Sequence, residues 1–276
     1  MVRERIADDI YVFTSKTYAQ VTAGAILTQD GVILIDTLFY PEETAQIKSF
    51  LEDRLGHQVR YLINTHYHAD HTQGTYLFPE AQTISHKLCR DLLHTTGRSG
   101  LKQAQHNLPE LADVRIVLPE LIFEEGVVQV YLGGKILELH HMPGHSLDMI
   151  GVMVLDNEIF FASDNAMPVP TFFDGSYEAL VASLKRTLAL KPDAVVQGHG
   201  EVILRGEVAN AIEDDLTYLQ RIHDLVGEVF AAGQPISALD TYDIEQFGKS
   251  RIPLNGLVAN LHHANLRQLY QTLQKT

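Results

Sequence analysis

The sequence has few of the features that identify secreted, membrane-bound or nucleic-acid-binding proteins. It contains one cysteine, Cys89, so no intrachain disulfide can form and a disulfide-stapled secreted fold is excluded. Basic residues are scarce: 21 Lys and Arg stand against 35 Asp and Glu, a formal net charge of −14. That charge disfavours non-specific binding to nucleic-acid phosphates and to anionic membrane surfaces.

Long apolar runs are also missing. The first residues carry mixed charges instead of the apolar stretch of a signal peptide, and no later segment is apolar enough over a sufficient length to span a bilayer. We therefore expect a cytoplasmic protein whose partner is a small-molecule substrate, with neither nucleic acid nor membrane involved. Assembly into a homodimer stays open at this point.

Histidine, by contrast, is abundant. The 276 residues include 14 histidines, about twice the usual share of this residue type. Hydrophobic residues make up 45% of the chain and charged residues 20%, as in a globular protein with a full apolar core. An excess of histidine favours a metal site, and the positions of the histidines decide the matter.

The first part of the chain predicts β-structure followed by a helix. Residues 10–14 are β-branched and aromatic, and residues 25–35 form a hairpin pattern around Asp30-Gly31. A helix is expected to begin at Pro41, with acidic residues in its first turn. A short apolar strand at 59–63 then leads directly into Asn64-Thr65-His66.

The rest of the chain repeats this alternation. Residues 86–112 are helical but polar and are predicted to be a mobile lid insertion. Strands are expected within 114–140, a hairpin within 150–162, a helix at 176–190, a strand at 194–197 and helices from 207 onward. Two β-rich halves, each closed by helices, predict an α+β fold in which two sheets pack face to face with helices outside. The expected organisation is a catalytic domain at 1–205 and a helical extension at 206–276 packed on the same domain.

The segment His66-Tyr67-His68-Ala69-Asp70-His71 carries the strongest chemical signal. It places four residues of metal-ligand type within six positions, directly after a predicted strand. In an extended chain His66, His68 and Asp70 point to one side, and a turn could aim His71 at a second ion. The alternative is an ordinary polar surface loop, which fits a lone His-x-His better than it fits four such residues.

Three later residues extend this cluster. His145 lies in a Pro-Gly-His turn, Asp164 ends the apolar run 160–163, and His199 stands between two glycines after an apolar strand. Each lies at the carboxyl end of a predicted strand, beside small residues that allow the backbone to approach closely. Singly, the histidines could be turn residues and Asp164 could be a helix cap, but together with the first cluster they indicate a metal site.

This ordered set of residues resembles the metallo-β-lactamase superfamily over roughly residues 10–205. The resemblance implies an αββα sandwich with two metal ions at one edge, and a ligand set like that of glyoxalase II. It further implies that one ion is held by His66, His68 and His145, the second by Asp70, His71 and His199, and that Asp164 bridges both. Nitrogen and oxygen ligands favour zinc, with iron or manganese as alternatives.

The resemblance implies a dinuclear metal-dependent hydrolase that cleaves an ester, thioester, lactone or related acyl bond. A metal-bridging hydroxide would attack the carbonyl carbon, and Asp70 would act as a catalytic residue that orients it. Asp36, after the apolar run 32–35, is expected to hold a ligand histidine by its other ring nitrogen. Cys89 is expected to be a packed or surface residue.

The substrate is less well defined. Candidates for the pocket are Tyr67, Met167, Phe172, Phe173 and His263. His262 and His263 lie on a helical stretch, and the alternative for both is a position on its solvated face. Met167 stands where acyl-homoserine lactonases usually have tyrosine. Glyoxalase II usually has glycine where this chain has Ser163, and its typical sequence after the last histidine is absent. The alternatives to the dinuclear hydrolase are a mononuclear iron persulfide dioxygenase and a β-lactam hydrolase.

Overall fold

The computed structural model describes residues 1–275 and contains two β-sheets. The first sheet has seven strands in sequence order: β1 (Val2–Ala7), β2 (Ile10–Thr14), β3 (Thr22–Thr28), β4 (Gly31–Ile35), β5 (Val59–Ile63), β6 (Gln82–His86) and β7 (Leu121–Phe123). Strands β1 to β4 are antiparallel, whereas β4 to β7 run parallel to one another. The carboxyl ends of β4, β5 and β6 therefore lie at one edge of this sheet.

The second sheet has five strands in the order β12-β11-β10-β9-β8. These strands are β8 (Val127–Leu132), β9 (Lys135–His141), β10 (Ile150–Val154), β11 (Ile159–Ser163) and β12 (Ala194–Gln197). All its pairings are antiparallel except that of β11 with β12. Because β11 and β12 are parallel neighbours, the residues that follow them emerge side by side.

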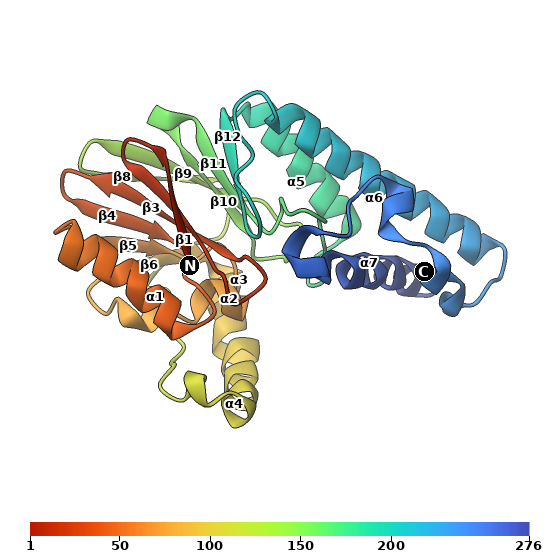
Figure 1. Ribbon diagram of the computed structural model, residues 1–276, viewed down its shortest axis with the longest axis horizontal. Helices are drawn as coiled ribbons and strands as arrows, with labels where there is room; N and C mark the ends of the chain where they lie inside the picture. The colour runs from red at the N-terminus through yellow and green to blue at the C-terminus, as the bar shows by residue number, and fades with distance from the viewer. Residues whose placement is uncertain (276) are drawn as a thin grey trace.

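The helices lie outside the two sheets (Figure 1). They are α1 (Pro41–Lys48), α2 (Ala69–Thr72), α3 (Lys87–Leu92), α4 (Arg98–Asn107), α5 (Tyr177–Leu190), α6 (Val208–Ala231) and α7 (Leu257–Leu273). π-Helical turns at Ser49–Arg54 and Leu93–Gly97 extend α1 and join α3 to α4. Within residues 1–275, no helix combines the length and the apolar character needed to cross a membrane.

Alternation along the strands divides the apolar side chains between two faces of each sheet. In β4, Ile33 and Ile35 face the second sheet, whereas Val32 and Leu34 pack with the Phe50 region beside α1. In β10, Val152 joins the core between the sheets, and its neighbour Met153 joins the core under α5. Both faces of the central strands are therefore buried, and the αββα sandwich expected from the sequence is confirmed.

The C-terminal helices share an apolar core with the second sheet. Leu184 of α5, Ile222 of α6 and Leu266 of α7 belong to one buried cluster that also contains Phe160 of β11. Figure 1 shows α6 and α7 extending from the α5 side of the sandwich, while α4 projects separately from the lower side of the molecule in this view. The boundary expected at residue 205 falls between β12 and α6, and the helical region beyond it packs on the sandwich.

Several strands and helices occupy the predicted positions. Strands β2 and β5 coincide with the predicted ranges 10–14 and 59–63, and the segment 86–112 is mainly helical. Strand β1 lies within the first 36 residues, which were predicted to be β-structure, whereas strand β6 was not predicted. Strand β6 has the sequence Gln-Thr-Ile-Ser-His and contains only one strongly apolar residue, Ile84, yet four of its five residues are buried. Pairing with β5 and β7 on its two sides, rather than its own composition, makes this segment a strand.

Candidate metal centre

The seven predicted ligand residues come from loops at one edge of the sandwich. His66, His68, Asp70 and His71 follow β5, and His145 follows β9. Asp164 comes directly after β11, and His199 follows β12 by two residues. Asn165 fixes the relative position of two of these loops, because its side chain accepts a hydrogen bond from His145 N at 2.9 Å and donates one to Met142 O at 2.7 Å.

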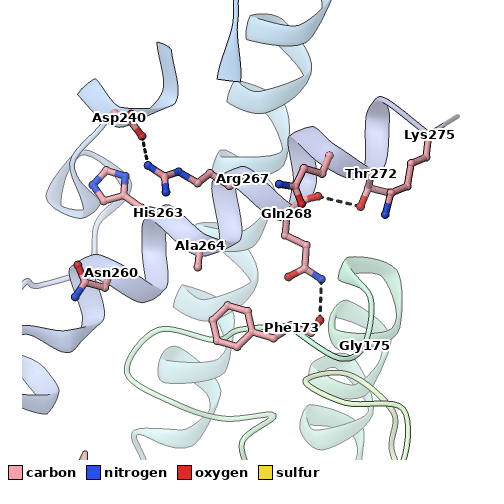
Figure 2. A pocket seen from close by; sticks show the side chains of 11 residues that line it. Phe173, Gly175, Asp240, Asn260, His263, Ala264, Arg267, Gln268, Thr272 and Lys275 are labelled. Carbon is pink, nitrogen blue, oxygen red and sulfur yellow. Dashed lines mark hydrogen bonds and ion pairs between the residues drawn. The ribbon is translucent and has the colours of Figure 1, made fainter. Parts of the chain in front are cut away.

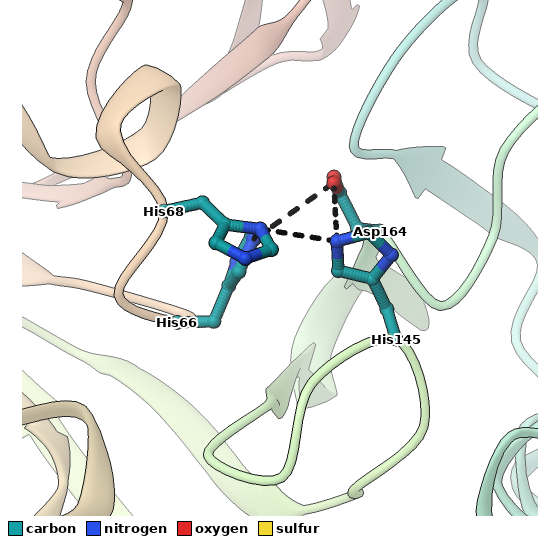
Figure 3. Close-up of side chains that lie close together, drawn as sticks. All are labelled: His66, His68, His145 and Asp164. Carbon is teal, nitrogen blue, oxygen red and sulfur yellow. Dashed lines mark hydrogen bonds and ion pairs between the residues drawn. The ribbon is translucent and has the colours of Figure 1, made fainter. Parts of the chain in front are cut away.

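One group of side chains consists of His66, His68, His145 and Asp164, whose ligand atoms all lie within 4.8 Å of one another (Figure 3). His68 Nδ1 is 3.0 Å from His66 Nε2 and 3.1 Å from His145 Nε2. Asp164 Oδ2 lies 3.4 Å from His145 Nε2 and 3.8 Å from His66 Nε2. Three imidazole nitrogens and one carboxylate oxygen thus converge on one point.

A second group consists of Asp70, His71 and His199. Asp70 Oδ2 is 3.4 Å from His199 Nε2 and 4.0 Å from His71 Nε2. Asp164 contacts this group as well, with Oδ1 3.1 Å from His71 Nε2 and Oδ2 3.5 Å from His199 Nε2. Asp164 therefore lies against both groups.

The chemistry of these side chains suits metal ions. His71 Nε2 and Asp164 Oδ1 are buried 3.1 Å apart, and neither makes a well-aligned hydrogen bond to a described residue, which is costly unless a ligand satisfies them. Burial lowers the pKa of His145 to about 4, so its imidazole is neutral at neutral pH and has a lone pair free. Burial also tends to lower the pKa of His199, but Asp164 and Asp70 outweigh it and raise the pKa to about 10. Such a negative potential attracts cations.

Each ligand histidine is oriented by a contact to its outward nitrogen. His71 Nδ1 lies 2.9 Å from Asp36 Oδ2, and the same carboxylate accepts hydrogen bonds from Thr65 N and Oγ1 at 2.8 and 2.7 Å. His145 Nδ1 contacts Thr171 Oγ1 at 2.8 Å, and His199 Nδ1 donates to Ala19 O at 2.8 Å. Partners of this kind fix both the tautomer and the direction of a ligand ring.

His68 has an outer partner that the sequence did not reveal, Asp174. Asp174 Oδ2 lies 2.8 Å from His68 Nε2 and accepts a hydrogen bond from Tyr67 OH at 2.6 Å. The hydrogen bond from His68 is the largest of the effects that lower the pKa of Asp174 to about 2. Asp174 stands in a loop without periodicity or a motif, so only its position in three dimensions identifies it.

A cavity of about 220 Å³ opens beside the two groups. Its walls include Tyr18 and Ala19 from the β2–β3 loop, and Met167 and Phe173 from the segment after β11. Leu254, just before α7, and Leu257 and Leu261 in its first turns add apolar side chains to the lining. Leu254 and Asn255 both have positive φ (53° and 56°), which turns the chain sharply into α7. Except for Ala19 and Thr171, the non-ligand walls are large aromatic or apolar residues.

The predicted pocket residues separate into three groups. Met167 and Phe173 line the cavity. Tyr67 does not line it and instead contacts Asp174, while Phe172 is 2% exposed and packs in the apolar core. His263 lines a neighbouring groove rather than the cavity itself, and its neighbour His262 is buried against Tyr218 OH at 2.9 Å rather than solvated. The predicted lid at 86–112 contributes no residue to the cavity lining.

Cys89 is buried and free, which agrees with a packing role. Burial raises its thiol pKa well above the usual value, and Asp148 nearby adds to this effect. The thiol is therefore protonated and poorly reactive.

Comparisons with known proteins agree with this description. The sequence model of the metallo-beta-lactamase superfamily matches residues 17–199. A hydroxyacylglutathione hydrolase of Rhodopseudomonas palustris is 29% identical over 196 residues, covering 70% of this chain and 68% of that protein. Another from Cereibacter sphaeroides is 28% identical over 178 residues, covering 63% of this chain and 60% of that protein.

Solved structures show the same fold. A metallo-beta-lactamase from Pontibacter korlensis aligns with a TM-score of 0.63 at 20% identity, covering 79% of this chain and 98% of that one. The inverting sec-alkylsulfatase Pisa1 from Pseudomonas sp. aligns with a TM-score of 0.72 at 15% identity, covering 98% of this chain and 50% of that one. The second alignment includes the C-terminal helices, so their packing on the sandwich also occurs in a known protein.

The fold and the clustered ligands together define a metal-dependent hydrolase. The chain belongs to the metallo-β-lactamase superfamily, whose model covers the seven candidate ligand residues from His66 to His199.

Proposed function

We propose that the protein is a dinuclear metal-dependent hydrolase that cleaves an ester or thioester bond of a small molecule. The observation that carries this proposal is the convergence of two ligand groups on the shared carboxylate of Asp164. His66, His68 and His145 would hold one ion, and Asp70, His71 and His199 the other. Zinc is the proposed metal, since imidazole and carboxylate ligands suit it, and iron and manganese accept the same ligand types.

Bound metal ions would supply Lewis acidity, which polarises a carbonyl group and makes water a nucleophile near neutral pH. The protein's own contribution begins with Asp70. Burial tends to raise the Asp70 pKa, but His71 and His199 outweigh it and lower the pKa to about 2. The carboxylate is therefore ionised at neutral pH and, on the cavity wall, can accept a hydrogen bond from the attacking water and orient it.

The shape of the site supports a substrate with a short acyl group and a longer polar portion. The cavity beside the ligands is small and largely apolar. Phe173 also lines a second space, a groove of about 1050 Å³ along α7, whose polar lining includes His263, Arg267 and Lys275 (Figure 2). An acyl group in the cavity would therefore leave the polar part of the substrate room along this groove.

Among acyl compounds, we propose a thioester of a hydrophilic thiol such as an acylglutathione. The relatives named hydroxyacylglutathione hydrolases support this class. Ser163 replaces the glycine usual in glyoxalase II, but its backbone has the φ of +48° that glycine would readily adopt. The alignments cover only 60 to 68% of those relatives, so their substrate is a starting point for assays.

The test combines metal analysis with a substrate panel. Protein purified without added metal is analysed for zinc, iron and manganese, then assayed on S-lactoylglutathione, 4-nitrophenyl acetate, a lactone, a chromogenic cephalosporin and a secondary alkyl sulfate. We expect close to two ions per chain and the highest kcat/KM on the thioester. Asp164→Ala should abolish both metal binding and thioester hydrolysis. Asp224→Ala removes a carboxylate that is 60% exposed on α6, and it should change neither the metal content nor the activity.

Other outcomes would identify the alternatives. A single iron per chain, with oxygen consumed in the presence of a glutathione persulfide, would replace the hydrolase with a persulfide dioxygenase. Preference for the cephalosporin would favour a β-lactam hydrolase. Folded protein that binds no ion under any loading condition would refute the proposal altogether.

A further inference from the structure

The loop between β2 and β3 forms one wall of the cavity. Its residues Tyr18 and Ala19 lie there beside His68, Asp70, His145, Asp164 and His199. The same loop reaches the ligands through its backbone, because Ala19 O accepts the hydrogen bond from His199 Nδ1 at 2.8 Å. The position of Tyr18 is therefore tied to the position of a ligand.

This loop is held in a strained backbone conformation. Ala19 and Gln20 have φ values of 44° and 51°, a left-handed region that residues with a Cβ rarely occupy. Two consecutive residues of this kind cost free energy and persist only where the surroundings enforce them. In this conformation Ala19 O faces His199, and Gln20 O accepts a hydrogen bond from Gly200 N at 3.0 Å.

Glu43 of α1 anchors the start of the same loop. Its carboxylate accepts hydrogen bonds from Ser15 Oγ at 2.5 Å, Lys16 N at 3.0 Å and Thr17 Oγ1 at 2.7 Å. Glu43 is 5% exposed, so water competes poorly for these contacts. The loop is thus fixed at both ends, at Glu43 and at His199.

The Tyr18 ring is fixed as well, while its hydroxyl is free. The ring stacks on Phe39 with centroids 4.2 Å apart and an interplanar angle of 9°, and Tyr40 lies edge-on at 6.4 Å. The hydroxyl makes no hydrogen bond to another of the described residues, unlike the hydroxyl of Tyr67, which donates to Asp174. Burial, with added effects of Asp70, Tyr40 and Asp164, raises the phenol pKa to about 12, so the group remains a donor.

We propose that Tyr18 is a catalytic residue, whose hydroxyl donates a hydrogen bond to the substrate oxygen that gains negative charge during hydrolysis. The proposal rests on the proposed function, because it assigns Tyr18 to the same acyl-cleavage site. A donor held in place beforehand stabilises that charge without reorganising, and this is the effect of an oxyanion hole. If Tyr18 served only to pack on Phe39, phenylalanine would serve equally well.

Tyr18→Phe removes only the hydroxyl and preserves the stacking. A hydrogen bond to a charged group that remains partly accessible to water corresponds to about tenfold in rate. We therefore expect kcat on S-lactoylglutathione to fall about tenfold with KM within twofold of the wild type. Tyr40→Phe is the matched control, since Tyr40 packs on the same ring but does not line the cavity, and its kinetics should be unchanged.

A binding measurement separates this proposal from the proposed function. Calorimetric titration of metal-loaded protein with methylphosphonate, a tetrahedral anion, is compared with titration with acetate, which is planar. Tyr18→Phe should weaken methylphosphonate binding about tenfold and acetate binding much less, with melting temperature and metal content unchanged. This comparison holds even if the wild type cleaves none of the panel substrates, an outcome that would count only against the proposed function.

Three results would overturn the assignment of Tyr18. The first is a kcat and a methylphosphonate affinity within twofold of the wild type. The second is a raised KM with unchanged kcat, which would indicate uniform binding of the substrate. The third is loss of metal or of thermal stability in Tyr18→Phe, which would show that the residue acts on the structure of the loop.

Discussion

Removal of the Asp174 carboxylate measures how much this residue contributes to metal binding. Asp174 Oδ2 contacts His68 Nε2 at 2.8 Å, and His68 Nδ1 points toward His66 and His145. Loss of such an outer partner costs roughly 10- to 100-fold in metal affinity. Because the Asp174 side chain is 49% exposed, water replaces part of the contact, and we expect Asp174→Ala to lose about tenfold, or about 1.4 kcal/mol.

The assay is a competition titration of metal-free protein with a chromophoric zinc chelator. The loss should affect only one of the two ions, because His68 belongs to only one ligand group. Tyr67→Phe is the control: it removes the other hydrogen bond to Asp174 Oδ2 but leaves the contact with His68, so affinity should change less than about threefold. Equal affinities of Asp174→Ala and the wild type for both ions would refute the reasoning.

Two further substitutions test other parts of the site. In Gly198→Ala the new Cβ would lie 1.8 Å from Asp164 Oδ1 and 2.7 Å from Asp164 N. We therefore expect this carboxylate to be displaced and elemental analysis to find less bound metal. The control is Gly227→Ala in α6, where nothing lies within 4 Å of the new Cβ, and this variant should bind metal normally. Normal metal content in Gly198→Ala would contradict the shared role of Asp164. Glu43 has a lowered pKa: burial alone would raise it, but hydrogen bonds from Ser15, Lys16 and Thr17 outweigh that effect. Glu43 therefore stabilises the folded protein at pH values above the pKa of Glu in the unfolded chain, about 4.3. This stabilisation is lost as the pH falls through the lower pKa that Glu43 has in the folded protein. Urea unfolding of metal-free protein should show Glu43→Gln less stable at pH 7, with the difference shrinking under acid; a difference independent of pH would contradict this assignment.

The positions of the ligand residues could be predicted because they depend on local features of the sequence. Each lies in a short loop after an apolar strand, and the strand direction carries it to the same edge. Asp36 could be included for the same reason, since it directly follows β4, which pairs with β5. The order of residues along the chain therefore indicated most of the side chains that the structure brings together at the candidate metal site.

The surroundings of the ligands could not be predicted in this way. Asp174 stands in a loop that Gln268 of α7 holds through Phe172 O and Phe173 O, and Tyr18 stands in a loop held by Glu43 of α1. His262 could be taken for a residue on a solvated helix face, yet packing of α7 against α6 buries it completely. Phe172 and Phe173 are adjacent, but one enters the core and the other the cavity, because the chain there is neither helix nor strand and has no period to follow.

Ser163 shows how a departure from the family pattern can be accommodated. It has a left-handed backbone (φ 48°), which costs a residue with a Cβ about 1–2 kcal/mol, and its hydroxyl lies 2.8 Å from Thr65 Oγ1 beside Asp36. Ser163→Ala keeps the strain and loses that hydrogen bond, so unfolding free energy should fall by about 1–2 kcal/mol. Ser163→Gly loses the same bond but relieves the strain, and should recover about 1 kcal/mol relative to alanine. Urea unfolding of the metal-free proteins measures both differences. An alanine variant as stable as the wild type would show that the Ser163 hydroxyl does not offset the backbone strain. A glycine variant less stable than the alanine variant would show that the backbone is not strained at this position.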